Sequence, residues 1–224
     1  MAGEAGLDAA TRTLVRLSAA LAVSDAPAWR DALAAAASHA SRTEIEETLL
    51  QAHLFVGFPA VLNALIEWRK LEGEEAAARR TGAARDARGG DVNAAVDGER
   101  LCRAVYGRGY EKLRRNVRRL SPDLDRWIVE DGYGKTLSRP GLSVETRELC
   151  IVALLAAGGH DRQLRAHLHG ALNVGCAPDR VEAALRHGVR AAGAARGRGT
   201  DPARLWRIWE EVVDRVEKKL CSST

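Results

Sequence analysis

A glutamate and a histidine in the second half of the chain have the types and spacing needed for acid–base chemistry. Glu148 lies within an otherwise apolar helical run, and His167 lies on the next predicted helix. A carboxylate and an imidazole on neighbouring buried helices can share a proton, and the imidazole can exchange that proton with a substrate. Glu148 and His167 are therefore candidate catalytic residues.

Both residues also have purely structural interpretations. Glu148 is near the start of its helix, where the helix dipole stabilises a negative charge that faces solvent. A lone histidine is commonly a half-buried core residue whose ring is hydrogen-bonded. A metal site made of His160, His167 and Glu148 is a third interpretation, but these spacings match no familiar zinc or iron motif. We predict neither a metal ion nor a cofactor.

Five further residues are predicted to bind a substrate: His160, Gln163, Arg147, Arg165 and Tyr133. Gln163 precedes His167 by four residues, so both side chains face one side of a helix that His160 can also reach. The two arginines flank the acid–base pair and could hold a carboxylate through forked hydrogen bonds. Pairing of the arginines with neighbouring acids is an equally good interpretation. The predicted partner is a small anionic molecule.

The composition predicts an all-α fold. The chain has 224 residues, is rich in Ala, Leu, Arg and Glu, and contains only 4% aromatic residues. These common residues lose little rotamer freedom in a helix. The net charge is +4, but basic residues alternate with acidic ones, which is typical of solvated helix faces. We therefore predict no nucleic-acid partner.

The cysteines and the hydropathy pattern bear on the cellular location. Cys102, Cys150, Cys176 and Cys221 have neither metal-ligand nor C-x-x-C spacing, so we interpret them as free thiols in a reducing compartment. No apolar run approaches the length of a membrane span, and the N-terminus has no charged-then-apolar signal pattern. We expect a soluble cytoplasmic protein without a membrane partner.

Hydrophobic periodicity, capping residues and Gly or Pro breaks define the predicted helices. They span 8–23, 25–38, 41–56, 59 onwards, 100–120 with a break at 107–109, 122–131, 144–157, 162–174, 178–187 and 201–221. Ser41 and Glu44 form a capping-box pattern, and Asp161 is expected to cap its helix. Gly188 is expected to end the helix that starts at Pro178. We expect a loop over 132–142 and flexible stretches over 77–98 and 189–200.

The chain contains a weak internal sequence repeat. At one constant offset Thr11 falls on Thr146 and Leu14 falls on Leu149, and the order of helices and caps agrees. The predicted organisation is a first repeat over 7–76, a linker over 77–98, a second repeat over 99–190 and a C-terminal amphipathic helix over 201–221. Thr13 and Ala32 stand where the second repeat has its acid and imidazole, so the first repeat is degenerate.

Several stretches resemble the carboxymuconolactone decarboxylase family. Residues 44–65 resemble the C-terminal helices of that family, and residues 103–113, 130–149 and 163–175 resemble the rest of its domain in order. The resemblance implies an all-α bundle shared with the alkylhydroperoxidase D-like proteins. It also implies a homo-oligomer, because members assemble as trimers or hexamers.

The peroxidase branch of that superfamily has the pattern Glu, eleven residues, Cys-x-x-Cys, three residues, His. This chain matches the pattern at Glu148 and His167 but has His160 and Gln163 at the two cysteine positions. Peroxide reduction requires an attacking thiolate and a second thiol. The resemblance therefore implies cofactor-free decarboxylation of a small anionic lactone or unsaturated carboxylic acid. It also favours the catalytic interpretation of Glu148 and His167 over the structural one, and we predict that role. A peroxidase and a non-catalytic oligomeric binding module are the alternatives.

Overall fold

The computed structural model describes residues 6–23, 26–73, 93–194 and 201–221, and every regular element in these ranges is helical. The predicted all-α class is thereby confirmed. The elements are α1 (Ala9–Val23), α2 (Ala26–Ala37), α3 (Arg42–Glu72), α5 (Ala94–Tyr106), η2 (Gly107–Gly109), α6 (Tyr110–Leu120), α7 (Pro122–Trp127), η3 (Ile128–Leu137), α8 (Val144–Gly158), α9 (Asp161–Asn173), α10 (Pro178–Ala194) and α11 (Pro202–Cys221).

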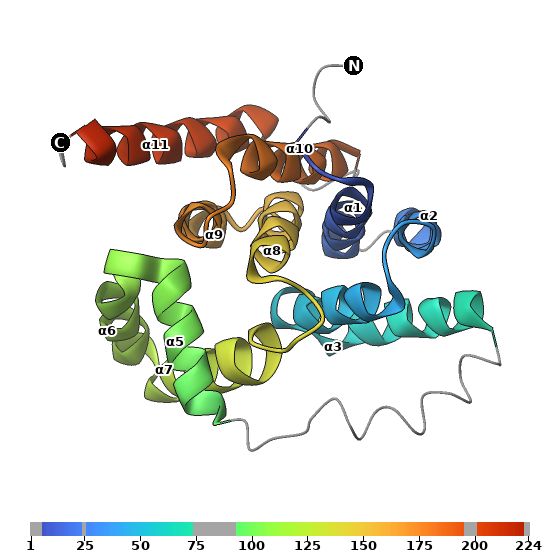
Figure 1. The fold of residues 1–224 in the computed structure, drawn as a ribbon, viewed down its shortest axis with the longest axis horizontal. Coiled ribbons are helices and arrows are strands. Elements are labelled where there is room, and N and C mark those ends of the chain that lie inside the picture. The colour runs from blue at the N-terminus through green and yellow to red at the C-terminus, as the bar shows by residue number, and fades with distance from the viewer. Residues whose placement is uncertain (1–5, 24–25, 74–92, 195–200, 222–224) are drawn as a thin grey trace.

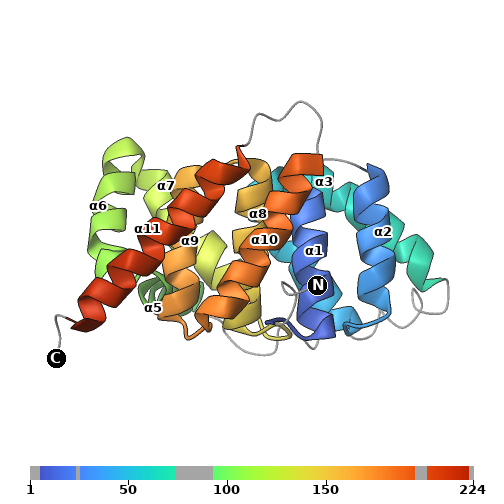
Figure 2. The same cartoon turned by 90° about the horizontal axis from the view of Figure 1, so that it is seen from above.

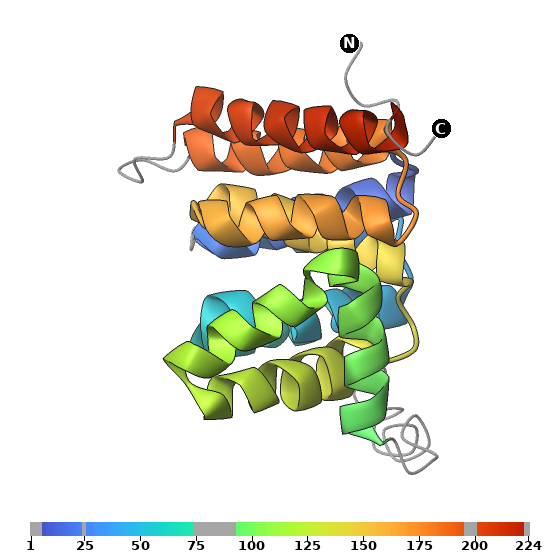
Figure 3. The same ribbon diagram turned by 90° about the vertical axis from the view of Figure 1, so that its left-hand side faces the viewer.

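The helices lie in three layers (Figures 1 and 3). In the middle layer α1 and α8 pack side by side, with α2 and α9 flanking them on opposite sides (Figure 2). Helix α10 covers one face of this layer together with α11, and α3 covers the other face together with η3 and α5. Helix α8 is the centre of the core, because every residue from Arg147 to Ala157 is buried.

Two sets of three helices follow the same order. Helices α1 and α8 begin at Ala9 and Val144, and α2 and α9 begin at Ala26 and Asp161, so the separation in sequence is the same for both pairs. The third pair, α3 and α10, begins at Arg42 and Pro178, one residue further apart. Helices α2 and α9 lie on opposite sides of the α1–α8 pair, and α3 and α10 lie on its opposite faces (Figure 1). The structure therefore supports the predicted duplication.

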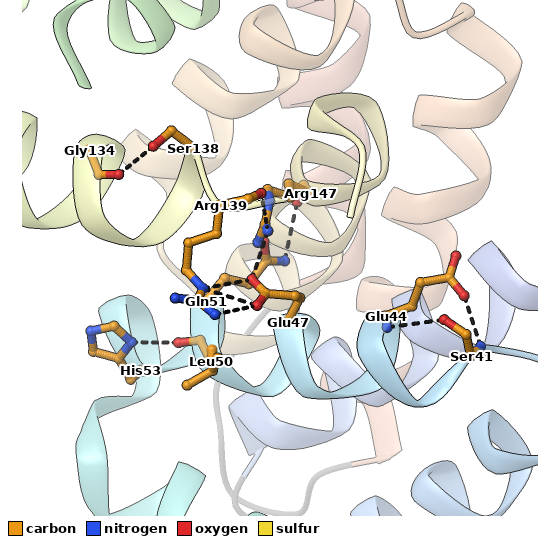
Figure 4. A network of polar contacts seen from close by, with 10 residues as sticks. All are labelled: Ser41, Glu44, Glu47, Leu50, Gln51, His53, Gly134, Ser138, Arg139 and Arg147. Atoms are coloured by element: carbon orange, nitrogen blue, oxygen red, sulfur yellow. Dashed lines mark hydrogen bonds and ion pairs between the residues drawn. The ribbon is translucent and has the colours of Figure 1, made fainter. Parts of the chain in front are cut away.

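Local signals placed several helix boundaries correctly. Ser41 accepts a hydrogen bond from the backbone N–H of Glu44, whose carboxylate accepts one from the backbone N–H of Ser41, so the capping box is confirmed (Figure 4). The predicted break before Pro59 lies at Gly57, where a φ of +78° interrupts α3. The short turn η2 separates α5 from α6 where we expected a break.

Other boundary predictions were wrong. Most of the predicted loop over 132–142 is helical, because residues up to Leu137 belong to the π-helix η3. Residues 94–98, assigned to the linker, form the start of α5, while residues 77–92 lie outside the described residues. His160, without a side-chain hydrogen bond, occupies the N-cap position expected for Asp161. Helix α10 continues to Ala194, through the predicted stop at Gly188.

Close helix packing explains two of these differences. A Cβ atom at Gly134 would lie 1.9 Å from the carbonyl oxygen of Ala94, so the glycine lets η3 pack directly on α5. A Cβ atom at Gly188 would lie 2.5 Å from the carbonyl oxygen of Ala153, which shows why α10 needs a glycine where it crosses α8. Both glycines resembled chain breakers in sequence but serve helix contacts.

Helix α3 is long and apolar enough to cross a membrane by length and composition alone, which contradicts our expectation that no segment qualifies. Its N-terminal half packs against α1 and α8 and includes the buried polar residues Glu47, Thr48 and Gln51. The break at Gly57 then divides the helix into two shorter pieces. This first half is therefore a core helix of the bundle.

We predict that Gly188→Ala destabilises the protein by about 1–3 kcal/mol, because the added methyl group meets the α8 backbone. Gly193→Ala is the matched control in the same helix, since a Cβ atom there has no neighbour within 4 Å. This control should be neutral or slightly stabilising. Urea unfolding of both variants tests the prediction, and equal stabilities would contradict the close packing of α10 on α8.

Candidate active site

The predicted acid–base pair is in contact. His167 Nδ1 lies 2.9 Å from Glu148 Oε2, and the two residues are only 5% and 2% exposed. A carboxylate accepts hydrogen bonds, so the neutral imidazole donates its Nδ1–H to Glu148 and keeps the lone pair on Nε2. The predicted contact is confirmed, whereas the catalytic role stays a prediction.

Helix packing brings the two side chains together. Glu148 lies on α8, and His167 lies on the adjacent helix α9. One turn after His167, a Cβ atom at Gly170 would lie 2.9 Å from Glu148 Oε2 and 2.7 Å from a methyl carbon of Val105. The glycine therefore leaves room for the carboxylate between α9 and α5.

His167 lines a pocket of about 670 Å³. Helix α3 of the first repeat, α5, α7, η3 and α9 together form its walls. Most of the lining is apolar, and its large residues are Phe55, Phe58, Trp127, Ile128 and Leu137. The Phe55 ring meets His167 edge-on at 5.9 Å between centroids. The imidazole therefore stands in a largely apolar hollow that both repeats build.

Two tyrosines give this pocket polar groups. The Tyr106 ring lies 6.3 Å from the His167 ring and 6.1 Å from the Tyr133 ring, measured between centroids. Burial raises the pKa of the Tyr106 phenol to about 12 and raises the pKa of Tyr133 well above its usual value. Both hydroxyl groups therefore stay protonated at neutral pH and can donate hydrogen bonds. Tyr133 lies in the pocket, as predicted.

His53, on α3, is a pocket residue that we did not predict. Its Nδ1 lies 2.5 Å from the carbonyl oxygen of Leu50 (Figure 4), and its ring stacks on Phe58 at 5.1 Å between centroids. A carbonyl only accepts, so Nδ1 carries the proton and Nε2 is the acceptor in the neutral ring. A signal existed, because His53 continues the i, i+4 row that Ile45 and Leu49 begin.

Lys135, on η3, was also missed. It lines the pocket, and its Nζ lies 2.5 Å from a carboxylate oxygen of Asp131, which lines the same pocket. We had predicted a loop over 132–142, so the i, i+4 spacing of Asp131 and Lys135 did not indicate a pair of neighbours on one helix. The pocket thus contains Lys135, His53 and His167, whereas we had expected Arg147 and Arg165 at the site.

Arg147 lies outside the pocket, which corrects its prediction as a substrate-binding residue. Its guanidinium group is buried and lies 2.8 Å from Glu47 Oε2, 3.2 Å from Gln51 Oε1 and 2.9 Å from the carbonyl oxygen of Arg139 (Figure 4). Arg139 makes a second ion pair with Glu47, at 2.8 Å. The partners Glu47 and Gln51 belong to the other repeat, far away in sequence, so local spacing could not reveal them.

The other predicted binding residues divide into two groups. Gln163 lines the pocket beside His167, although its side chain is otherwise exposed. Arg165 is paired with Glu211 on α11 and lies outside the pocket. His160 is exposed at the start of α9 and lies outside the pocket lining as well. The prediction of a substrate contact for these last two residues is therefore not supported by their positions.

Metal and thiol chemistry were the remaining interpretations. Within the described ranges, no three His, Cys, Asp or Glu side chains are grouped as metal ligands, so His160 does not join the acid–base pair. Burial raises the pKa of the Cys102, Cys150 and Cys176 thiols to about 12. At neutral pH these three groups are therefore protonated thiols and poor nucleophiles.

Comparisons with known proteins show which family and which relatives the chain is similar to. The family model described as "Carboxymuconolactone decarboxylase family" matches residues 1–70 and 122–200, which include α1, α2 and nearly all of α3 together with α7, η3, α8, α9 and α10. The chain is 33% identical over 72 residues to the 4-carboxymuconolactone decarboxylase of Acinetobacter baylyi, which covers 32% of this chain and 54% of that protein.

Two yeast proteins are also similar. The chain is 30% identical over 147 residues to "Peroxisomal protein 2" of Schizosaccharomyces pombe, with coverage of 63% of this chain and 65% of that protein. It is 33% identical over 88 residues to the Saccharomyces cerevisiae protein of the same name, covering 39% of this chain and 31% of that protein. The chain thus spans less than two thirds of the length of each of these three relatives.

We predict that Arg147→Met lowers the free energy of unfolding by about 3 kcal/mol, because it leaves part of the Glu47 charge buried without its partner. Arg100→Met is the matched control, since it breaks an exposed pair with Asp97 and should cost less than about 1 kcal/mol. Urea unfolding measures both effects. If Arg147 instead bound substrate, its variant would keep its stability and change only ligand affinity.

Proposed function

Because the chain belongs to the carboxymuconolactone decarboxylase family, we propose that it is a cofactor-free decarboxylase for a small anionic lactone or unsaturated carboxylic acid. The observation that carries this proposal is the buried contact between Glu148 and His167 on the wall of an apolar pocket. The contact supplies a proton carrier, and the pocket supplies space for a small molecule. The relative from Acinetobacter baylyi is named for a reaction of this class.

The proposed reaction breaks the bond between a carboxylate carbon and the neighbouring carbon. Carbon dioxide leaves, and the electron pair stays on the substrate, delocalised into a conjugated carbonyl group as an enolate. The imidazolium form of His167 then delivers its Nε2 proton to carbon, while the Glu148 carboxylate stabilises the positive charge of the ring before transfer. Solvent returns a proton to His167 before the next cycle.

The enolate oxygen needs a hydrogen-bond donor during this step. Tyr106 and Tyr133 are the candidates, because both hydroxyl groups remain protonated and both residues line the pocket. Donors fixed in a site with little water stabilise developing negative charge more strongly than water does. In this proposal the two phenols provide hydrogen-bond donors within a largely apolar lining.

The negative charge of the substrate requires a different partner from the one we first expected. Arg147 and Arg165 are both committed to carboxylates outside the pocket. His53 and Lys135 both line the pocket. Lys135 is also paired, with Asp131, so the proposed anion-binding residue is His53, whose imidazolium form can donate its Nε2–H to a carboxylate. His53 comes from the first repeat, so substrate recognition and proton transfer are shared between the two repeats.

A non-catalytic binding module is the second candidate function. The longest of the three matches is to a yeast protein whose name states a peroxisomal location and no reaction. In such a module the same pocket would bind an anion without converting it. Homo-oligomeric assembly and a cytoplasmic location stay predictions, and the names of the two yeast relatives make the peroxisome the alternative location. A peroxidase is disfavoured, because the described thiols are buried and protonated.

We predict that the purified protein releases carbon dioxide from 4-carboxymuconolactone and that His167→Ala lowers kcat by about 100-fold or more, because the proton donor is lost. Glu148→Gln should lower kcat less, since it keeps a hydrogen-bond partner for His167 but removes the charge. His39→Ala, at an exposed histidine, is the control and should retain full activity. Full activity of His167→Ala would refute the assignment. Binding without turnover by the unaltered protein would favour the module.

We predict that His53→Phe raises KM about tenfold with little change in kcat, because it removes an anion partner and leaves the proton donor intact. His53→Gln retains a polar side chain of similar reach and should raise KM less. Steady-state kinetics with both variants separates the two parameters. A fall in kcat at constant KM would instead assign His53 to the proton-transfer step.

A further inference from the structure

The pocket that contains His167 is larger than a small lactone requires. Its volume of about 670 Å³ lies within the range of about 300–1,000 Å³ that is typical of sites for drug-sized ligands. A lactone or unsaturated acid that carries only its carboxylates fills part of such a space. The proposed reaction therefore leaves a stretch of apolar wall without an occupant.

The exposure of the lining residues distinguishes an inner and an outer part of the pocket. His167 and Tyr133 are 5% and 4% exposed, so the reactive groups lie at the inner end. Phe58, Leu124 and Trp127 line the same pocket but are 67%, 49% and 48% exposed. These three residues form an apolar rim at the outer end.

The apolar rim is a cluster of side chains that water solvates poorly. Eight large apolar side chains are exposed in the described ranges, and three of them meet at this rim, from α3 and α7. A cluster of exposed apolar groups at the mouth of a pocket is typical of a binding groove. Asp131 and Lys135 also line the pocket, but they are paired with each other, so their charges offset one another.

Aromatic rings on α3 connect the reactive groups with the apolar rim. Phe55 meets the His167 ring edge-on, and Phe58 stacks on the ring of His53. Apolar ring surface therefore lies directly beside both imidazoles. A carbon chain attached to the reacting end of a ligand meets an apolar wall from its first atoms.

We propose that the ligand of this pocket is an acid or lactone that carries a medium-length, unbranched apolar chain. The inference rests on the proposed function for the position of the reacting end beside His167, and it deepens that function by naming the substrate class. The anionic end lies near His53, and the chain extends outward between Phe58 and Trp127. Each methylene group that these walls remove from water strengthens binding. Phe58 and Trp127 are thus specificity-determining residues.

The test measures how the affinity of the full-length protein depends on chain length. The probes are butanoate, hexanoate, octanoate and decanoate, which lack the conjugated carbonyl group that the proposed decarboxylation needs. Isothermal titration calorimetry measures each Kd, and backbone amide NMR spectra locate the site. The variants are Phe58→Ala and Trp127→Ala. Leu120→Ala is the matched control, because Leu120 is 86% exposed and lies outside the pocket lining.

We expect the affinity to rise about tenfold for every two methylene groups added to the chain. The amide signals of Phe55 and Leu137 should shift on binding. In Phe58→Ala and Trp127→Ala the rise should fall to about threefold or less at an unchanged melting temperature, because part of the wall is missing. Leu120→Ala should retain the full dependence on chain length.

Equal affinities for butanoate and decanoate would overturn the proposal, and so would a length dependence that both rim variants retain. If these variants dissociate an oligomer in sedimentation experiments and leave the affinities unchanged, the rim contacts a second copy and the proposal fails. Length-dependent binding without release of carbon dioxide from 4-carboxymuconolactone or a long-chain analogue would support the proposal and refute the decarboxylase. Release of carbon dioxide combined with length-independent binding would refute the proposal alone.

Discussion

The ion pair between Glu47 and Arg147 fixes the two repeats against each other. Both charges are buried, so neither can exchange its partner for water without a large cost in free energy. Because Glu47 lies on α3 and Arg147 on α8, the pair sets the position of the first repeat's third helix relative to the second repeat's acid–base residues. Arg139, which also pairs with Glu47, adds the segment between η3 and α8 to the same arrangement. These ion pairs therefore fix the relative positions of the helices that form the pocket walls.

Duplication produced two hollows of different character. One retains an imidazole whose orientation is fixed by a carboxylate, and aromatic side chains from α3, α5, α7 and η3 line it. The other, a pocket of about 440 Å³ lined by α1, α2 and α10, has Ala32 at the position of the imidazole. Helices α5 and η3 precede α8 in the sequence and pack beside the site of the second repeat, where α5 contacts α9 and η3 contacts α3. The acid–base pair and the elements that pack over it thus occur on the same side of the bundle.

The sequence was informative where local chemistry decides the structure. The capping box at Ser41 and the break at Gly57 could be predicted from residue types and spacing, whereas the contact of Glu148 with His167 also required the family resemblance. Tertiary contacts decided the rest. The glycines at 134 and 188 resemble helix stops, yet both allow helices to pack closely. Arg147 resembled a ligand-binding residue because its partner on α3 is distant in sequence.

The origin of the pocket walls has a further consequence. His53 and Phe55 belong to the first repeat, whereas His167 and its carboxylate belong to the second. Separated from its neighbour, the second repeat would lose the wall that α3 forms and would expose more of this imidazole to bulk water. The degenerate half of the chain thus contributes part of the covering of the acid–base pair in the other half.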